Sequence, residues 1–156
     1  MPAGSPLSYC LRLLKTRLRT VYELDQAMRK REVSEDQRLA IIQQLCDAHL
    51  LDDLRFARSW VVTRDRLSPR GEPVLRRELQ QKGIARELAD QVLRERREAV
   101  NSQDEPQPSE EELARELLTR RARLDANLEP QVRKRRQMAF LQRRGFTYEV
   151  IRRILE

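Results

Sequence analysis

The stretch Leu79-Gln80-Gln81-Lys82-Gly83-Ile84-Ala85-Arg86-Glu87-Leu88-Ala89-Asp90-Gln91-Val92-Leu93 has the pattern of two short helices joined by a tight turn. An apolar residue closes the first helix, and another follows the turn five positions later. Two more apolar residues come eight and nine positions after that, on the next helix. Gly83 can take the left-handed conformation that commonly ends a helix. The stretch therefore predicts a helix-turn-helix whose apolar residues are Leu79, Ile84, Val92 and Leu93.

The same register occurs twice more in the chain. It is found at Leu141, Phe146, Ile154 and Leu155, with Arg144-Gly145 in the place of Lys82-Gly83. It is also found at Met28, Val33, Ile41 and Ile42, this time without the glycine. Three copies of one pattern indicate a tandem helical repeat. The predicted fold is all-α, an elongated array of three tandem three-helix repeats.

The composition also favours small bundles over one large core. Charged residues make up 37% of the chain and aromatic residues only 4%. Each helix can therefore bury one apolar stripe and must leave its other faces in water. Small bundles placed side by side satisfy this condition better than a single sphere does.

Capping signals and composition divide the chain. Residues 1–6 are expected to form a disordered lead-in, and 99–108 a linker, because both segments lose helical periodicity and gain proline. Outside these two segments we expect repeats at 7–51, 52–98 and 109–156. Capping boxes are expected at Thr20 with Glu23, Ser34 with Gln37 and Ser109 with Glu112.

The second repeat has a predicted inner face, and the third a longer middle helix. Phe56, Ala57, Trp60 and Val61 have the spacing of one buried helical face. The middle helix of the third repeat is expected to exceed that of the second by about a turn and a half. The added length holds the basic run Arg133-Lys134-Arg135-Arg136.

The chain is basic, with a formal net charge of +7, and 28 of its 32 cationic residues are arginine. Two explanations remain open: a GC-rich coding sequence, or guanidinium groups that bind phosphate or carboxylate in a bidentate manner. Positive charge is concentrated in the second repeat and in residues 128–156. A polyanion would therefore meet the second and third repeats first.

Several function classes find no support. The chain has one histidine, no glycine-rich phosphate loop and no cysteines at metal-ligand spacing, so we expect no enzyme, no cofactor and no metal site. Cys10 and Cys46 are expected to be free thiols on apolar helical faces. No segment has the pattern of a signal peptide or a membrane span, which leads us to expect a cytosolic protein. We also expect the protein to act as a monomer.

One resemblance to a known family is specific. The run Leu51-Asp52-Asp53-Leu54-Arg55-Phe56-Ala57-Arg58-Ser59-Trp60-Val61 is followed by Arg76-Arg77-Glu78-Leu79 and Lys82-Gly83-Ile84. In this order and at these separations, the segments resemble the RecX family, regulators of the RecA recombinase. The resemblance is strongest over residues 50–93 and extends more loosely to residues 141–146 and to the first repeat. Two features differ from the family pattern: the loop 68–73 has no aromatic residue after its glycine, and the first repeat has no glycine before Val33.

The resemblance implies a chain of three-helix repeats that lies in the helical groove of the RecA filament on single-stranded DNA. It also implies that the protein limits filament growth or promotes disassembly, and so inhibits ATP hydrolysis, strand exchange and co-protease activity. We expect the surface for RecA and single-stranded DNA, with duplex DNA bound more weakly, to use the basic groups of repeats two and three. These are Arg70, Arg76, Arg77, Lys82, Arg133, Lys134, Arg135, Arg136, Arg143 and Arg144.

Two other functions remain open from the sequence, and a third is disfavoured. A general DNA-binding protein that does not depend on RecA would need only the basic charge. A scaffold for another protein would use the segment Met138-Ala139-Phe140-Leu141, which is apolar all round. A helix-turn-helix that reads duplex sequence is disfavoured, because the candidate recognition helices carry apolar residues rather than side chains suited to base edges.

Overall fold

The computed structural model describes residues 4–156, and in this part of the chain it contains nine helices and no strand. The first trio is α1 (Pro6–Thr16), α2 (Val21–Arg29) and α3 (Glu35–Asp47). The second is α4 (Asp53–Leu67), α5 (Glu72–Gln81) and α6 (Arg86–Ala99). The third is α7 (Glu110–Asp125), α8 (Pro130–Arg143) and α9 (Tyr148–Leu155). We call these trios repeats one, two and three.

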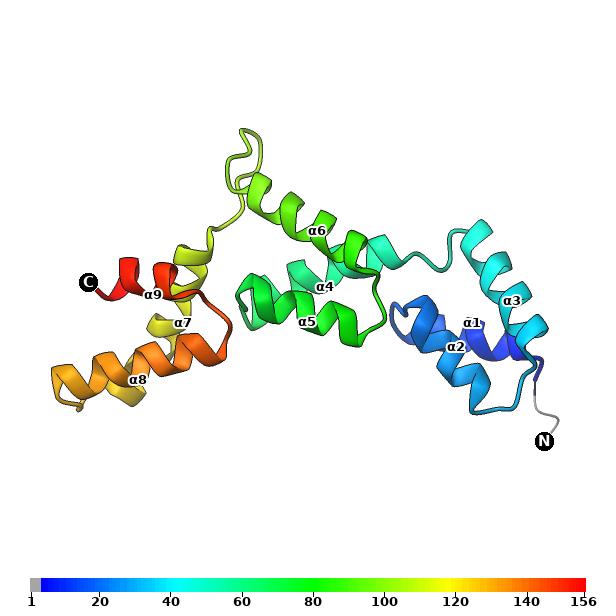
Figure 1. The fold of residues 1–156 in the computed structure, drawn as a ribbon, viewed down its shortest axis with the longest axis horizontal. Coiled ribbons are helices and arrows are strands. Elements are labelled where there is room, and N and C mark those ends of the chain that lie inside the picture. Colours follow the sequence, from blue (N-terminus) through cyan, green and yellow to red (C-terminus); the bar gives the residue numbers. More distant parts are fainter. Residues whose placement is uncertain (1–3) are drawn as a thin grey trace.

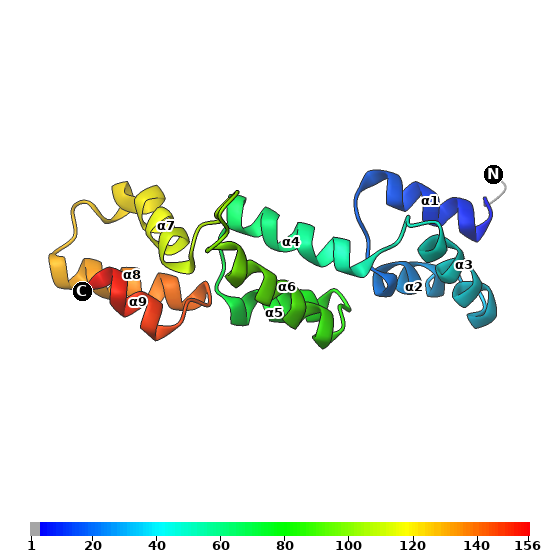
Figure 2. The same cartoon turned by 90° about the horizontal axis from the view of Figure 1, so that it is seen from above.

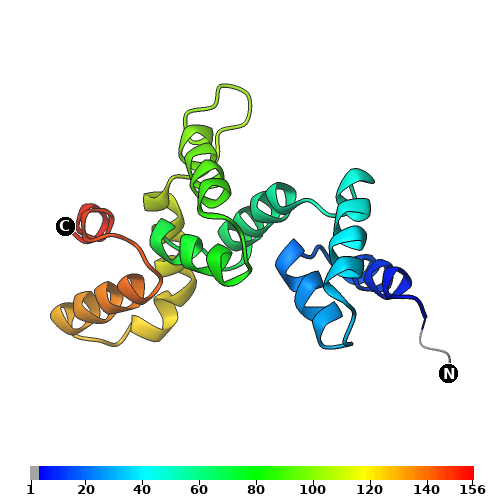
Figure 3. The ribbon, with the colours of Figure 1, turned by 45° about the vertical axis from the view of Figure 1, so that its right-hand side comes forward.

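The repeats lie in a row, and Figures 1 and 2 show the chain running from one end of the array to the other. The helix pairs with extensive contact all belong to the same repeat. Each repeat also has its own cluster of buried apolar side chains. In Figure 3 the connection between α6 and α7 protrudes from the array as a loop. The predicted all-α array of three three-helix repeats is confirmed.

All three repeats close their second helix with the same hydrogen bond. The N–H of Val33 donates to the carbonyl of Met28 at 3.2 Å, Ile84 to Leu79 at 3.0 Å, and Phe146 to Leu141 at 3.2 Å. The residue before each donor has a positive φ: 57° at Glu32, 79° at Gly83 and 87° at Gly145. Repeat one therefore makes the same left-handed turn with a glutamate, at a backbone cost that glycine avoids.

The helix caps agree with the predicted signals at most positions. Thr20 with Glu23 and Ser109 with Glu112 form complete capping boxes. Ser34 accepts from the N–H of Gln37, but Gln37 does not return the bond, so the third predicted box is only half formed. The predicted lead-in of residues 1–6 includes residues 1–3, which lie outside the described residues. Helix α1 begins at Pro6, one residue earlier than predicted, because Ser5 caps the N–H of Ser8.

The predicted core residues of the turns are largely buried. Leu79, Ile84, Val92 and Leu93 are all buried. In repeat three Ile151 is fully buried, whereas Ile154 and Leu155 pack at the edge of the cluster. In repeat one Leu45 takes that central place, and Ile41 and Ile42 pack beside it. In these two repeats, the third helix therefore faces the core with the stripe of residues next to the one that the sequence predicted.

Two predictions about repeats two and three were wrong in detail. Trp60 is only half-buried, because its indole N–H needs an acceptor and donates to Glu78 Oε2 at 2.9 Å at the edge of the cluster. Helix α8 has 14 residues against 10 in α5, which is about one turn longer rather than a turn and a half. The reason is that α5 begins at Glu72, one residue before its proline, whereas α8 begins at Pro130 itself.

The two junctions between repeats use the same pair of hydrogen bonds. At the first junction, the N–H of Val21 donates to Asp53 Oδ1 at 2.9 Å. At the second, the N–H of Glu72 donates to Glu110 Oε1 at 2.9 Å. In both cases the first N–H of a second helix donates to an acid in the first turn of the next repeat, so a donor that has no partner within its own helix is satisfied. The junction geometry is therefore repeated together with the helices.

The second bond of each junction joins the same helix end to the turn of the next repeat. Thr20 Oγ1 donates to the carbonyl of Lys82 at 2.7 Å, and the N–H of Gly71 donates to the carbonyl of Arg144 at 2.9 Å. A Cβ at Gly83 would overlap the side chain of Tyr22, and one at Gly145 would overlap Val74. The glycines thus serve both the left-handed turn and the close approach of neighbouring repeats.

We predict that Gly83→Ala lowers the free energy of unfolding by about 2 kcal/mol, because alanine is strained at φ 79° and its methyl group meets Tyr22. Urea denaturation followed by circular dichroism measures this. Adding Tyr22→Ala should restore only the part of the loss that comes from overlap with the ring, because alanine keeps the Tyr22 Cβ, which the new methyl group meets first. Gly4→Ala, at an exposed position with ordinary contact distances, is the control and should change stability little. Equal stability of Gly83→Ala and the parent would contradict the assigned turn.

Candidate interaction surface

Two positively charged positions recur at the same register in every repeat. The first lies twelve residues after the N-cap of the first helix and is occupied by Arg17, Arg64 and Arg121. The second lies immediately before the positive-φ residue and is occupied by Arg31, Lys82 and Arg144. The array therefore carries a regular series of cations, two in each repeat.

At the first junction Arg17 and Lys82 share one acid. Glu23 accepts from Arg17 at 3.0 and 3.2 Å, and it also lies 3.4 Å from Lys82 Nζ in the next repeat. Burial raises the pKa of Glu23, but the hydrogen bonds from Arg17 and the Thr20 N–H, with the charges of Arg17 and Lys82, outweigh it and leave that pKa lowered. Glu23 is therefore held ionised between repeats one and two.

In repeat two an aromatic ring lies between the two cations. The guanidinium of Arg64 lies 4.8 Å from the centre of the Trp60 ring, and Lys82 Nζ lies 5.2 Å from it. Both distances allow a cation–π interaction. Glu78 accepts from Arg64 at 3.0 Å as well as from Trp60, so this pair of cations also has an acid close by.

Repeat three repeats the arrangement with a ring from a different helix. Phe140 of α8 lies 4.2 Å from the guanidinium of Arg121 and 5.0 Å from that of Arg144. Arg121 pairs with the buried Asp125 at 2.9 Å. Arg144 donates to Ser68 Oγ at 2.8 Å across the second junction. The half-buried Phe140 thus packs in its own repeat and lies between two cations at the boundary with repeat two.

The second junction is also fixed by a buried arginine. Arg96, with 8% of its side chain exposed, donates to Asp65 at 2.9 and 3.0 Å and to Glu110 at 2.8 Å. It also donates to the carbonyl of Arg70 at 3.2 Å. Burial alone would lower the pKa of Arg96, but the hydrogen bonds and charges of Asp65 and Glu110 raise it. Arg96 therefore joins α4, α6 and α7 as a permanent cation.

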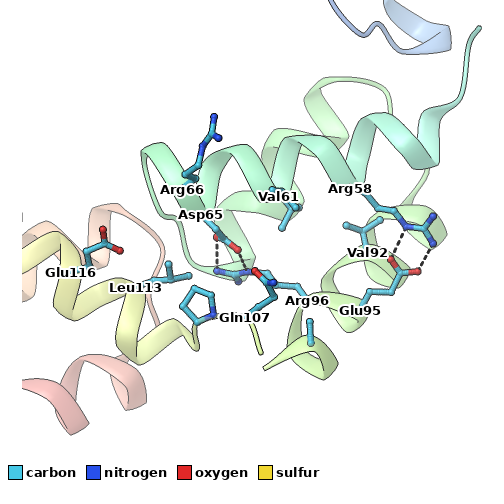
Figure 4. A pocket seen from close by; sticks show the side chains of 13 residues that line it. Arg58, Val61, Asp65, Arg66, Val92, Glu95, Arg96, Gln107, Leu113 and Glu116 are labelled. Carbon is cyan, nitrogen blue, oxygen red and sulfur yellow. Dashed lines mark hydrogen bonds and ion pairs between the residues drawn. The ribbon is translucent and has the colours of Figure 1, made fainter. Parts of the chain in front are cut away.

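An open groove of about 610 Å³ lies above this arginine, between α4, α6 and α7. Figure 4 shows Arg96 turned toward Asp65 near the middle of the labelled residues and Arg58 paired with Glu95 at one side. Much of the lining is apolar, including Val61, Val92 and Leu113. Because these charged groups are already paired, the groove presents mainly an apolar surface.

Among residues 4–156, no three His, Cys, Asp or Glu side chains are grouped so that they could hold a metal ion. Within the same range, no helix combines the length and the apolar character that crossing a bilayer requires. Cys10 and Cys46 are both free thiols, as the sequence predicted. Burial raises the pKa of the Cys10 thiol.

Comparison with known proteins matches each repeat to a separate family model. Residues 7–45 match the first three-helix domain of RecX, 52–93 the second and 109–155 the third. The chain belongs to the RecX family. It is 33% identical to a regulatory protein RecX of Streptomyces coelicolor, over 99% of this chain and 80% of that protein. It is 35% identical to a regulatory protein RecX of Mycolicibacterium smegmatis, over 91% of this chain and 75% of that protein.

Solved RecX structures share the fold of this chain. A crystal structure of RecX from Lactobacillus salivarius superposes with a TM-score of 0.80 at 24% sequence identity, covering 97% of this chain and 93% of that one. A second crystal structure, of a regulatory protein RecX, gives a TM-score of 0.79, also at 24% identity, covering 97% and 71%. At this identity the likeness shows the three-repeat fold alone. The resemblance noted in the sequence is thereby confirmed at the level of family and fold.

The RecX fold gives the ten basic residues singled out in the sequence different roles. Three of them are bound within the array. Arg76 pairs with Asp90 at 2.9 Å, and Lys82 pairs with Glu23. Arg133 donates to the carbonyls of Asp125, Ala126 and Leu128 at the end of α7, at 3.1 to 3.2 Å. These three side chains stabilise helices and junctions first.

The other seven are available in two groups. Five are exposed and make no ion pair within residues 4–156: Arg77, Lys134, Arg135, Arg136 and Arg143. Arg70 and Arg144 are half-buried and lie near one another at the second junction. Arg70 Nε lies 3.9 Å from Glu78 Oε1, a long distance for an ion pair. The bonds that Arg144 makes to Ser68 and to the N–H of Gly71, on either side of Arg70, place Arg70 and Arg144 at the same junction.

Sequence reasoning missed the residues that build the junctions. Arg96, Glu110 and Arg121 were not singled out, although all three contact charged partners that the fold depends on. Aligning the repeats on their N-caps would have placed Arg17, Arg64 and Arg121 at one register. No comparable signal exists for Arg96, because its partners lie 31 and 14 residues away in the chain.

We predict that Arg96→Met lowers the free energy of unfolding by about 3 to 5 kcal/mol, because it leaves Asp65 and Glu110 without their cation at a buried position. Its neighbour Arg97 supplies a matched control. Arg97 pairs with Glu72 at 2.6 Å but is 57% exposed, so Arg97→Met should cost less than about 1 kcal/mol. Chemical denaturation measures both. Similar losses for the two variants would contradict the structural role given to Arg96.

Proposed function

We propose that the chain binds the RecA filament on single-stranded DNA, lies in its helical groove and inhibits RecA activities by limiting filament growth or promoting disassembly. The observation that carries this proposal is that all three repeats match the RecX family in order and nearly end to end. RecX relatives that carry the name of regulatory proteins cover most of the chain. The inhibited activities would be ATP hydrolysis, strand exchange and the co-protease function.

The structure supplies a physical basis for such regulation. Polar junctions hold the three repeats in a defined row, so the array presents its surfaces at fixed spacings. A ligand shifts a conformational equilibrium only by its difference in affinity for the two states. An array that contacts more than one RecA subunit would bind best to one subunit spacing, and would thereby favour one filament state.

In this proposal the exposed cations of α8 make the first contact with the filament. Lys134, Arg135 and Arg136 project from α8 without internal ion pairs within residues 4–156. Charges of this kind raise the rate of association with a polyanion and fix its orientation. Arg133 is excluded from this set, because its guanidinium holds the end of α7.

The test is the DNA-dependent ATPase of RecA on single-stranded DNA in the presence of the chain. We predict that the parent inhibits it and that Lys134→Gln/Arg135→Gln/Arg136→Gln requires about tenfold more protein for half-inhibition. The control removes three exposed cations elsewhere: Arg12→Gln/Arg94→Gln/Arg115→Gln. Absence of inhibition by the parent would overturn the proposed function. Equal effects of the two triple variants would overturn the role of α8.

A RecA-independent DNA-binding protein would behave differently in the same experiment. It would compete for the DNA, so adding free single-stranded DNA would abolish its inhibition in proportion to the DNA added. A filament-specific regulator keeps inhibiting at protein concentrations well below the concentration of DNA sites. Inhibition that depends only on the ratio of chain to free DNA would therefore favour the general DNA-binding function.

A further inference from the structure

The two junctions differ in one respect that bears on ligand binding. At the first junction, Glu23 pairs with both Arg17 and Lys82. Glu23 lies three residues after its N-cap, and the corresponding position in α5 is Val74. The second junction is therefore built like the first, but without the acid.

A second acid is also replaced. Glu78, which binds Arg64, comes immediately before Leu79, and the residue immediately before Leu141 is Phe140. Arg144 stands at the register of Lys82, yet within residues 4–156 it has no carboxylate within 4.0 Å. Its polar partner is the neutral hydroxyl of Ser68. Sequence changes at two positions thus leave this cation unpaired.

Other cations surround Arg144. Burial, and then the positive charges of Arg70, Arg64, Arg120 and Arg121, lower the pKa of the Arg144 guanidinium. Three of these neighbours have their own acids: Arg64 with Glu78, Arg120 with Glu116, and Arg121 with Asp125. Arg70 shares Glu78 at 3.9 Å. The carboxylates near these neighbouring guanidinium groups are thus already paired with them, which leaves Arg144 without a counter-charge of its own.

We propose that the second junction is a phosphate site for the backbone of a single nucleic acid strand, with Arg144 and Arg70 as its binding groups and Phe140 as the ring beside the neighbouring base or sugar. The proposal rests on the proposed function and deepens it, because it names the chemistry and the place of the DNA contact. A phosphodiester supplies the missing negative charge, and a guanidinium can bind its oxygens in a bidentate manner.

The surroundings favour a nucleic acid strand over an acidic protein segment. A half-buried aromatic ring close to two cations suits the alternation of phosphate and base in an unpaired strand. The cationic positions also recur from repeat to repeat, which suits a regular polyanion. A carboxylate of a partner protein would use the charge but not the ring.

The test is fluorescence anisotropy of a fluorescein-labelled oligothymidylate of about 15 nucleotides with the full chain at several salt concentrations. Arg144→Gln should weaken binding about fivefold and reduce the slope of log K against log salt by about 0.7, the value for one contact with a single strand. Arg12→Gln removes one exposed charge far from the site and is the matched control. Thermal melts by circular dichroism establish that each variant is folded.

Two further variants keep the test independent of folding effects at Arg144. Phe140→Glu places a carboxylate at the register of Glu78, between Arg121 and Arg144, and should weaken binding about tenfold. Glu78→Gln keeps an acceptor for the Trp60 N–H, frees Arg64 and Arg70, and should strengthen binding about threefold. Opposite effects of these two substitutions would be difficult to obtain from a loss of structure.

The outcomes separate this site from the proposed function. If Arg144→Gln binds DNA with the affinity and salt dependence of Arg12→Gln, the phosphate site is overturned, even if the parent inhibits RecA. If Arg144→Gln weakens binding only to RecA without DNA, the site takes an acidic protein surface and the proposal is likewise overturned. If the parent does not inhibit RecA but the variants change oligonucleotide binding as stated, the proposed function falls and the phosphate site stands.

Discussion

The array depends on backbone N–H groups that a helix cannot satisfy itself. The first N–H of α2 and of α5 has no partner within its own helix, and in each case an acid in the first turn of the next repeat accepts it. Helix pairs with extensive contact lie only within repeats, so these bonds, the bonds to the turn carbonyls and the packing at the glycines fix how one repeat follows another. The row of repeats is therefore set by polar geometry more than by a shared core.

The two ends of the array lack the parts of this junction. The first position of α1 is Pro6, where α4 and α7 have Asp53 and Glu110. The first position of α8 is Pro130, which has no N–H to donate, whereas α2 and α5 have Val21 and Glu72. At these two positions the carboxylate or the N–H of the junction bond is therefore absent.

Much of the fold could be predicted from the sequence, because the deciding signals are local. The spacing of Leu79 and Ile84 around Gly83 defines a turn, and its recurrence defines the repeats. The charged contacts could not be predicted in this way. Arg76, Lys82 and Arg133 are indistinguishable in sequence from exposed cations, and only the fold shows that they pair or cap. Trp60 similarly has core spacing, but the need of its N–H for an acceptor holds it at the edge.

The arginines have two different roles. Cations bound to acids or carbonyls, such as Arg96 and Arg133, maintain the geometry of the array. We propose that cations with no paired carboxylate within residues 4–156 carry the interaction surface, on α8 and at Arg144. A large excess of arginine is therefore compatible with both roles, and the total charge of the chain does not measure the charge available to a partner.

Amide hydrogen exchange, followed by nuclear magnetic resonance, can probe the junction bonds individually. First-turn N–H groups of a helix normally exchange readily, and Asp36 in α3 provides such a reference. The N–H groups of Val21 and Glu72 should exchange much more slowly than that of Asp36. In Glu110→Ala, protection should be lost at Glu72 and kept at Val21. Exchange of Val21 and Glu72 as fast as Asp36 in the parent would contradict the junctions described.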